Sequence, residues 1–106
     1  MRKIAVLIFI LSFSVIVFSA LTGITNEGYF FTRTKEQLEK VIDYSVAKDY
    51  EALESYTKEL TRTGNGGMLK PGLEVYIEKS SWGLVKFRVK GRTDSFWTVS
   101  EAIKRN

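Results

Sequence analysis

A strict alternation of apolar and polar residues in two neighbouring segments sets the narrowest limits on the fold of this chain. Residues 73–78 and 85–90 each place every second side chain on one face, as half-buried β-strands do. Between them, Ser81-Trp82-Gly83 predicts a three-residue hairpin loop with glycine in the left-handed position. This loop predicts five facing pairs: Ser80 with Leu84, Ile77 with Phe87, Val75 with Val89, Glu78 with Lys86, and Glu74 with Lys90. Both charged pairs are complementary, and a one-residue slip would set apolar against charged side chains.

A third strand is predicted at residues 95–99, after a turn that contains Gly91. Phe96 and Trp97 are adjacent, so one of them must face outwards. We expect Trp97 to fill the core, because aromatic residues supply much of the core of a small domain. Thr98 and Glu101 have the spacing of a capping box, which predicts a short helical turn over residues 99–104.

Helical periodicity dominates residues 34–61. Thr34 and Gln37 predict a capping box at its start, and an apolar stripe follows at spacings of three and four residues. Lys48 and Asp49 interrupt the stripe, and Asp49 is suited to cap a second helix. We therefore expect two short helices, about 35–47 and 50–61, with a single continuous helix as the alternative.

A glycine-rich linker at residues 63–67 separates this helical part, 34–61, from a β-rich part at 68–106. The chain has 106 residues, enough for one domain. We predict an α+β fold in which two N-terminal helices pack on a small, strongly bent antiparallel sheet. Residues 20–33 are interpreted as a lead segment, flexible over residues 20–28, with Tyr29–Phe31 as an edge strand or a strap across the core.

The N-terminus predicts export. Arg2 and Lys3 precede an apolar run at residues 4–18, the pattern of a secretory signal peptide covering residues 1–19. Residues 4–21 also reach the minimum length of a membrane span, so an uncleaved anchor in the inner membrane is the alternative. Both alternatives predict that the rest of the chain is periplasmic or extracellular.

Composition excludes many kinds of chemistry. The chain has no histidine and no cysteine, which removes Ser-His-Asp and Cys-His catalysis, disulfides and Cys/His zinc sites. Three weaker candidates are the carboxylates of Glu74 and Glu78 for glycan cleavage, the serines Ser80 and Ser81 as nucleophiles, and Asp43, Asp49 and Glu51 as ligands of a divalent cation. Surface charges, a turn and a solvated helix face explain these residues more simply. We therefore predict a protein that is not an enzyme and that uses no cofactor and no metal.

Charge is unevenly distributed along the chain. Residues 34–60 carry a net charge of −3, whereas residues 62–106 carry nine basic and four acidic residues, a net charge of +5. One face of the predicted hairpin and its tip combine basic and aromatic side chains, which form the candidate partner-binding site: Tyr76, Trp82, Lys86, Arg88 and Lys90. Basic and aromatic surfaces also bind nucleic acid, but an exported protein seldom meets it. The simpler interpretation is that acidic neighbours partly neutralise the basic row, which then only keeps the sheet soluble.

Residues 69–103 resemble a bacterial Src-homology-3-like domain. The matching features are Leu69-Lys70-Pro71-Gly72 before a strand, Trp82-Gly83 before the next, a turn at Gly91, and Phe96-Trp97-Thr98-Val99 running into a one-turn helix. The resemblance implies a five-stranded barrel, with Tyr29–Phe31 and Met68–Lys70 as its remaining strands. The whole chain after residue 19 is also similar to small uncharacterised secreted bacterial proteins. Members of the family are usually accessory modules that bind cell-wall peptide or protein ligands, which implies binding rather than catalysis.

These observations favour an exported, non-catalytic binding or accessory module of the cell envelope. Its expected partner is an envelope protein, a cell-wall polymer or another anionic polymer, and no nucleic acid. Membrane contact is expected only through residues 4–21, if they stay uncleaved. The alternative function is a periplasmic protein inhibitor or an immunity-type factor.

Overall fold

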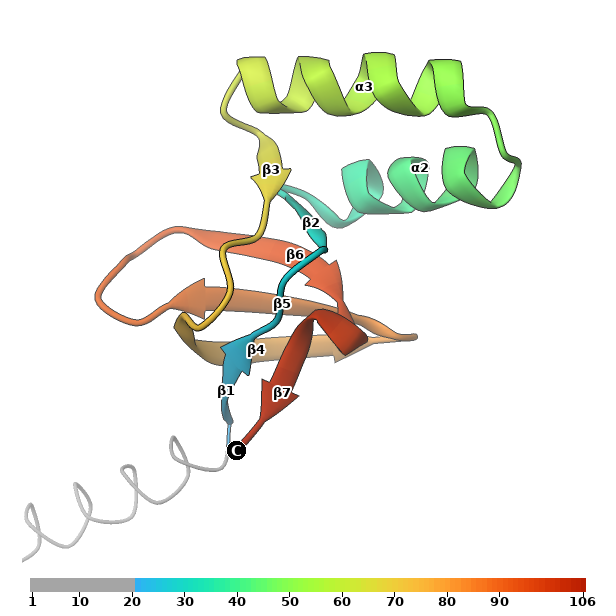
Figure 1. Ribbon diagram of the computed structural model, residues 1–106. Helices are drawn as coiled ribbons and strands as arrows, with labels where there is room; N and C mark the ends of the chain where they lie inside the picture. The colour runs from blue at the N-terminus through green and yellow to red at the C-terminus, as the bar shows by residue number, and fades with distance from the viewer. Residues whose placement is uncertain (1–20) are drawn as a thin grey trace, which may run out of the picture.

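The computed structural model describes residues 21–106, so the predicted signal peptide or anchor lies outside the described part. The fold is α+β, with one seven-stranded antiparallel sheet in the order β3-β2-β6-β5-β4-β1-β7 and two helices at one end of it (Figure 1). The elements are β1 (Thr22–Thr25), β2 (Phe30–Thr32), α2 (Lys35–Val46), α3 (Tyr50–Arg62), β3 (Gly66–Met68), β4 (Glu74–Ser81), β5 (Leu84–Val89), β6 (Ser95–Val99), a one-turn 3₁₀ helix (Ser100–Ala102) and β7 (Ile103–Arg105).

The two helices confirm the prediction from periodicity and caps. Thr34 and Gln37 form the predicted capping box at the start of α2, and Asp49 caps α3 by accepting a hydrogen bond from the backbone N–H of Ala52. Lys48 has a positive φ of 57°, a left-handed turn that ends the first helix and excludes the single continuous rod.

The position of the helices in the chain differs from the prediction. They lie between β2 and β3, so they are not N-terminal to the sheet. The segment expected to be a flexible lead instead contains β1, which is paired with β4 on one side and with β7 on the other. The expected edge strand, β2, lies between β3 and β6. The sheet is open, with β3 at one edge and β7 at the other, and it is not a closed barrel.

The hairpin of β4 and β5 follows the predicted register near its base but not near its tip. Val75 faces Val89 and Ile77 faces Phe87, as expected. Beyond Ile77 the register shifts, because Glu78 is an extra residue that forms a β-bulge. Towards the tip the facing pairs are therefore Lys79 with Lys86, Ser80 with Val85, and Ser81 with Leu84. The loop has two residues instead of three, and the predicted pairs of Glu78 with Lys86 and of Ser80 with Leu84 are wrong.

The C-terminal segment also differs in part from the prediction. The 3₁₀ helix has no side-chain cap, so the capping box of Thr98 and Glu101 is wrong. Thr98 is buried in β6 and donates its hydroxyl hydrogen to the carbonyl of Phe30. After the single turn the chain continues as β7, a strand that the sequence analysis missed.

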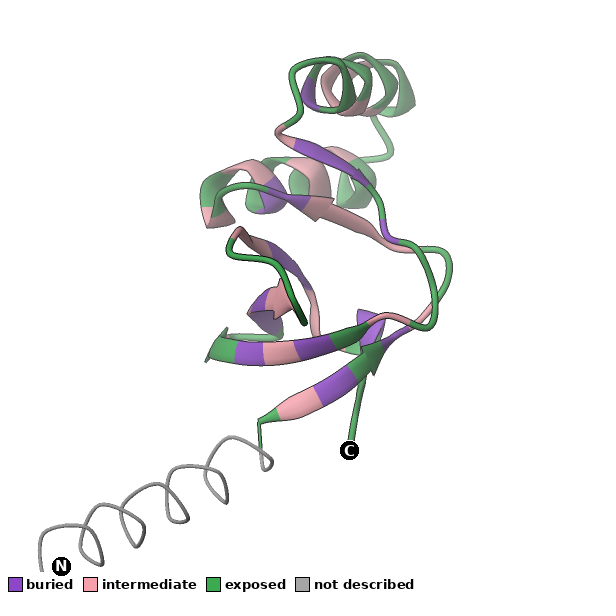
Figure 2. Ribbon diagram, turned by 90° about the vertical axis from the view of Figure 1, so that its left-hand side faces the viewer, coloured by how far each residue is buried: buried purple, intermediate pink, exposed green. Residues whose placement is uncertain are grey.

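The core has two parts, on opposite faces of β5 and β6. The larger cluster consists of Leu69, Val75, Ile77, Val85, Phe87, Ala102 and Ile103. The smaller cluster joins Leu38 of α2 to Leu84 and Trp97, which confirms Trp97 as a core residue with only 8 % of its surface exposed. Leu38 and Leu60 are the buried residues of the two helices, whose remaining surface is half-buried or exposed (Figure 2).

Candidate functional site

The tip of the β4–β5 hairpin presents a fully exposed indole. Trp82 and Gly83 form the two-residue turn, and their φ angles of 51° and 80° are both positive, as in a type I′ turn. Such turns favour asparagine, aspartate or glycine, because a residue with a bulky side chain is strained in the left-handed conformation. The side chain of Trp82 gains no burial in return, since 99 % of the residue surface is exposed. Backbone strain combined with an exposed aromatic side chain marks this residue as a candidate contact for a partner.

Two cations from distant parts of the chain hydrogen-bond to the two serines that precede this turn, one on each face of the hairpin, because consecutive strand residues point to opposite faces. The Nζ of Lys35, at the start of α2, donates a hydrogen bond of 3.1 Å to the Oγ of Ser81. The Nη2 of Arg105, in β7, donates a hydrogen bond of 2.9 Å to the Oγ of Ser80. The sequence analysis missed both cations, because only the tertiary fold brings them to the hairpin.

Two further cations face each other on the hairpin itself. Lys79 lies directly opposite Lys86, so their side chains share one face of the sheet. Within residues 21–106, neither lysine takes part in an ion pair, and the same is true of Lys35 and Arg105. We call Trp82 with these four cations the hairpin-tip site.

The rest of the predicted basic row is neutralised. Arg88 lies 3.6 Å from the Oε2 of Glu78 and stacks over the ring of Tyr76, with its Cζ 4.8 Å from the ring centroid. Glu78 also accepts a hydrogen bond from the hydroxyl of Ser95. Lys90 lies 3.1 Å from the Oε2 of Glu74, which confirms that predicted pair. The five predicted site residues are therefore split: Trp82 and Lys86 lie near the tip, while Tyr76, Arg88 and Lys90 lie towards the base.

The pKa of Lys90 supports this division. The hydrogen bond to the Glu74 carboxylate, followed by the attraction of its charge and that of Tyr76, raises the pKa of Lys90 above its ordinary value. The charge of Lys90 is thus paired with the Glu74 carboxylate on the same hairpin. The hairpin-tip cations remain available for a partner.

A hollow of about 360 Å³ lies beside the tip, between the hairpin and α2. Its lining includes the apolar side chains of Ile42 and Leu84, with Trp82 at the turn. Glu39 and Asp43 line it from the α2 side, so negative charge is present next to the four cations. The hairpin-tip site nevertheless has more positive than negative charges.

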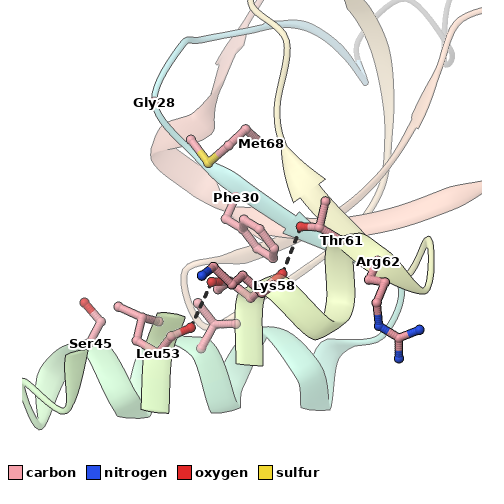
Figure 3. A pocket seen from close by; sticks show the side chains of 10 residues that line it. Gly28, Phe30, Ser45, Leu53, Lys58, Thr61, Arg62 and Met68 are labelled. Atoms are coloured by element: carbon pink, nitrogen blue, oxygen red, sulfur yellow. Dashed lines mark hydrogen bonds between the residues drawn. The ribbon is translucent and has the colours of Figure 1, made fainter. Parts of the chain in front are cut away.

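A larger and mainly apolar groove of about 760 Å³ lies between the helices and the β2–β3 pair (Figure 3). Phe30 and Met68 lie on its sheet side, and Leu53 and Ser45 lie on its helix side. Thr57 and Thr61 also line it, but their hydroxyls donate to carbonyls one helical turn earlier, which leaves little hydrogen-bonding capacity towards the groove. Sequence analysis missed this groove, because it exists only where β2 and β3 meet the helices.

Five of the seven catalytic and metal candidates take part in structural contacts. Glu74 and Glu78 form ion pairs with Lys90 and Arg88, and Ser80 and Ser81 accept the hydrogen bonds of the hairpin-tip cations. Asp49 is a helix cap. In the described part of the chain, no three acidic residues are grouped so that they could hold a metal ion.

Comparisons with protein-family models, with curated proteins and with solved structures found no match to this chain. Over residues 21–106, neither helix is long and apolar enough to cross a membrane.

Proposed function

We propose that this chain is an exported, non-catalytic binding or accessory module of the cell envelope, and that it binds an anionic partner through the hairpin-tip site. The observation that carries the proposal is the complete exposure of Trp82 on a turn whose backbone disfavours tryptophan. Tryptophan is enriched among the residues that dominate binding interfaces. The four surrounding cations have no ion-pair partner within residues 21–106, which favours a negatively charged partner.

The arrangement of strands supports, in addition, the proposed relationship to Src-homology-3-like modules. The family has five strands and a one-turn helix, and β7-β1-β4-β5-β6 are five consecutive neighbours in the sheet. The 3₁₀ helix stands between β6 and β7, where the sequence resemblance expects the one-turn helix. In this arrangement β2, the two helices and β3 form an insertion between the first two strands. The remaining strands are thus β1 and β7, and not the Tyr29–Phe31 and Met68–Lys70 segments that the resemblance suggested.

A binding assay with a fold-neutral substitution tests the proposal. Trp82→Asn removes the indole and places a residue that tolerates the left-handed conformation, so a loss of binding cannot be ascribed to unfolding. We expect this variant to lose at least ten-fold in cosedimentation affinity for a cell-envelope fraction, the scale of one interface anchor. Tyr50→Ala is the matched control, because Tyr50 is an aromatic residue that is 63 % exposed on α3.

Two outcomes would count against this function. If Trp82→Asn and Tyr50→Ala bind like the unchanged chain, the hairpin tip is not the binding site. If instead the chain recovers a single envelope enzyme in a stoichiometric complex that survives Trp82→Asn, the inhibitor or immunity-type function is favoured.

A further inference from the structure

The shape of the hairpin-tip site indicates which kind of anionic partner it can bind. The indole of Trp82 projects from a two-residue turn at the edge of the hollow beside α2, and 99 % of the residue surface stays exposed. A protruding tip of this kind suits insertion into a soft surface, because no residue among 21–106 covers the indole. Tryptophan favours the boundary between lipid headgroups and acyl chains, where its ring is buried and its N–H stays hydrated.

The type of cation points in the same direction. Three of the four hairpin-tip cations are lysines, whose ammonium groups act as point charges on flexible stems. Lysine stems can lie along an apolar boundary while their charges reach the headgroups. Arg88 has the bidentate geometry that suits a discrete carboxylate partner, but it is already held by Glu78. The cations left for a partner are thus suited to a diffuse negative surface.

The place where the chain enters the described fold adds a geometric argument. The backbone N–H of Ile77 donates a 2.7 Å hydrogen bond to the carbonyl of Leu21, the last residue of the segment 4–21 that is long enough to span a membrane. Ile77 precedes Trp82 by five residues, which is at most about 17 Å along a strand. Leu21 and Ile24 are also exposed apolar residues, at 43 % and 38 %. Leu21, where the chain enters the fold, therefore lies beside β4, and the exposed indole of Trp82 follows the end of the same strand.

We infer that the anionic partner is the surface of a membrane that contains anionic lipids, with Trp82 at the headgroup boundary and Lys79, Lys86, Lys35 and Arg105 around it. This inference rests on the proposed function and specifies its partner. It adds a second membrane contact to the one expected through residues 4–21. Glu39 and Asp43 line the hollow on the α2 side of the tip, so some negative charge lies beside Lys35.

Depth-dependent quenching of tryptophan fluorescence tests this inference on the full chain. The chain has two tryptophans, and Trp97 is buried, so quenching by lipids brominated near the headgroups reports on Trp82. The probes are vesicles of phosphatidylcholine alone and vesicles that also contain phosphatidylglycerol. Because the readout is the depth of one side chain, it gives the same information whether or not residues 1–19 are removed.

We expect strong quenching in the anionic vesicles, weak quenching in phosphatidylcholine, and loss of the quenched component in Trp82→Phe. Lys79→Gln with Lys86→Gln should reduce the membrane-docked population of the tip in anionic vesicles about five-fold per lysine. Lys48→Gln with Lys70→Gln is the control that makes the same change of charge away from the tip, and it should retain quenching.

Equal quenching of Trp82 in both kinds of vesicle, or none in either, would overturn the inference. A soluble polyanion or an acidic envelope protein that protects Trp82 from acrylamide, without quenching by brominated lipids, would also overturn it. The proposed function would stand in that last case, because the tip would still bind an anionic partner. The proposed function itself fails only if Trp82→Asn leaves envelope binding unchanged.

Discussion

Lys79 lies directly opposite Lys86 across the hairpin, and within residues 21–106 neither ammonium group has a carboxylate partner. Like charges that face each other across two strands destabilise the pair by about 0.2–1 kcal/mol. We therefore predict that Lys79→Glu raises the free energy of unfolding by about that amount, measured by urea denaturation. The same substitution should weaken binding to the envelope fraction, as expected where a functional surface is maintained at the expense of stability.

A double-mutant cycle gives the decisive comparison for this pair. Lys79→Glu and Lys86→Glu should each stabilise the hairpin, while the two together should restore repulsion and remove the gain. The coupling should shrink at high salt, because the side chains are near the surface. If the effects of the two substitutions are additive, the two side chains diverge in solution. The hairpin-tip site would then not concentrate positive charge at Lys79 and Lys86.

Trp82 leads to a second prediction about stability. A non-glycine residue in the left-handed conformation is strained by about 1–2 kcal/mol, and asparagine tolerates this conformation better than tryptophan. Trp82→Asn should therefore raise the free energy of unfolding by about 1 kcal/mol, measured by thermal or urea denaturation. A decrease of the same size would show that the indole packs on the fold in solution.

Trp97 provides the contrast for this measurement. Removing a buried tryptophan side chain costs about 3–5 kcal/mol, a large part of the roughly 5–15 kcal/mol that stabilises a small domain. Trp97→Ala should thus unfold at a much lower urea concentration than the unchanged chain. Acrylamide should quench Trp82 and leave Trp97 largely unquenched, since their exposed fractions are 99 % and 8 %.

The helices and the central strands could be predicted because their signals are local. The Thr34 capping box and the Asp49 cap fix two helix starts within a few residues of sequence. Alternation fixed which side chains of β4 and β5 face the larger core cluster, up to Ile77 and Phe87. For these elements the nearby residues and the tertiary contacts favour the same conformation.

The predicted conformation of the hairpin tip was wrong because two loop lengths, three residues and two residues, compete at this sequence. The three-residue loop was favoured because it places only Gly83 in the left-handed conformation. Trp82 would then be free of backbone strain. The fold instead places both Trp82 and Gly83 in that conformation and moves the extra residue into a bulge at Glu78. The bulge frees Glu78 from Lys86 and lets it contact Arg88. Nothing in the local sequence marks this exchange.

The short strands β1 and β7 could not be predicted because long-range contacts stabilise them. β1 has four residues and β7 has three, too few for a clear alternation. Their pairing also explains why two hairpin-tip cations were missed, since Arg105 reaches Ser80 only once β7 lies beside β1. Lys35 reaches Ser81 only because α2 packs against Leu84 and Trp97.

Gly23 tests the pairing of β1 with β7. A Cβ at this position would lie 2.5 Å from the Cγ2 of Ile103 and 2.9 Å from the carbonyl oxygen of Lys104. Gly23→Ala should therefore separate the two strands and lower the free energy of unfolding by about 1–3 kcal/mol, the usual cost of overpacking. Amide hydrogen exchange should become faster at Asn106, whose N–H donates to Thr22.

Gly67→Ala is the matched control for this change. Its added Cβ would make an ordinary contact of 3.4 Å with the ring of Phe31 in the same sheet. It should cost much less than Gly23→Ala, because no backbone has to move. Equal costs for the two variants would argue that β7 does not dock closely on β1.

The ion pair of Glu74 and Lys90 gives a prediction about pH. The raised pKa of Lys90 arises first from its hydrogen bond to Glu74, so Glu74→Gln should lower that pKa towards the ordinary value of about 10.4. NMR titration of the Lys90 side chain measures it, and Glu78→Gln is the control that should leave it unchanged. Because the pKa is higher in the folded chain, the stabilisation is complete below the unfolded pKa of about 10.4 and is lost as pH rises through the folded value.

The size of this effect is small, because Lys90 is exposed and solvent screens the pair. The free energies of unfolding of the unchanged chain and Glu74→Gln should thus differ by a small, constant amount from neutral pH to about pH 9 and converge in stronger alkali. If Lys90 instead titrates identically in both proteins, the ion pair does not form in solution. Lys90 would then be a further cation without a partner, and the positive surface would extend from the tip along β5 towards Tyr76 and Arg88.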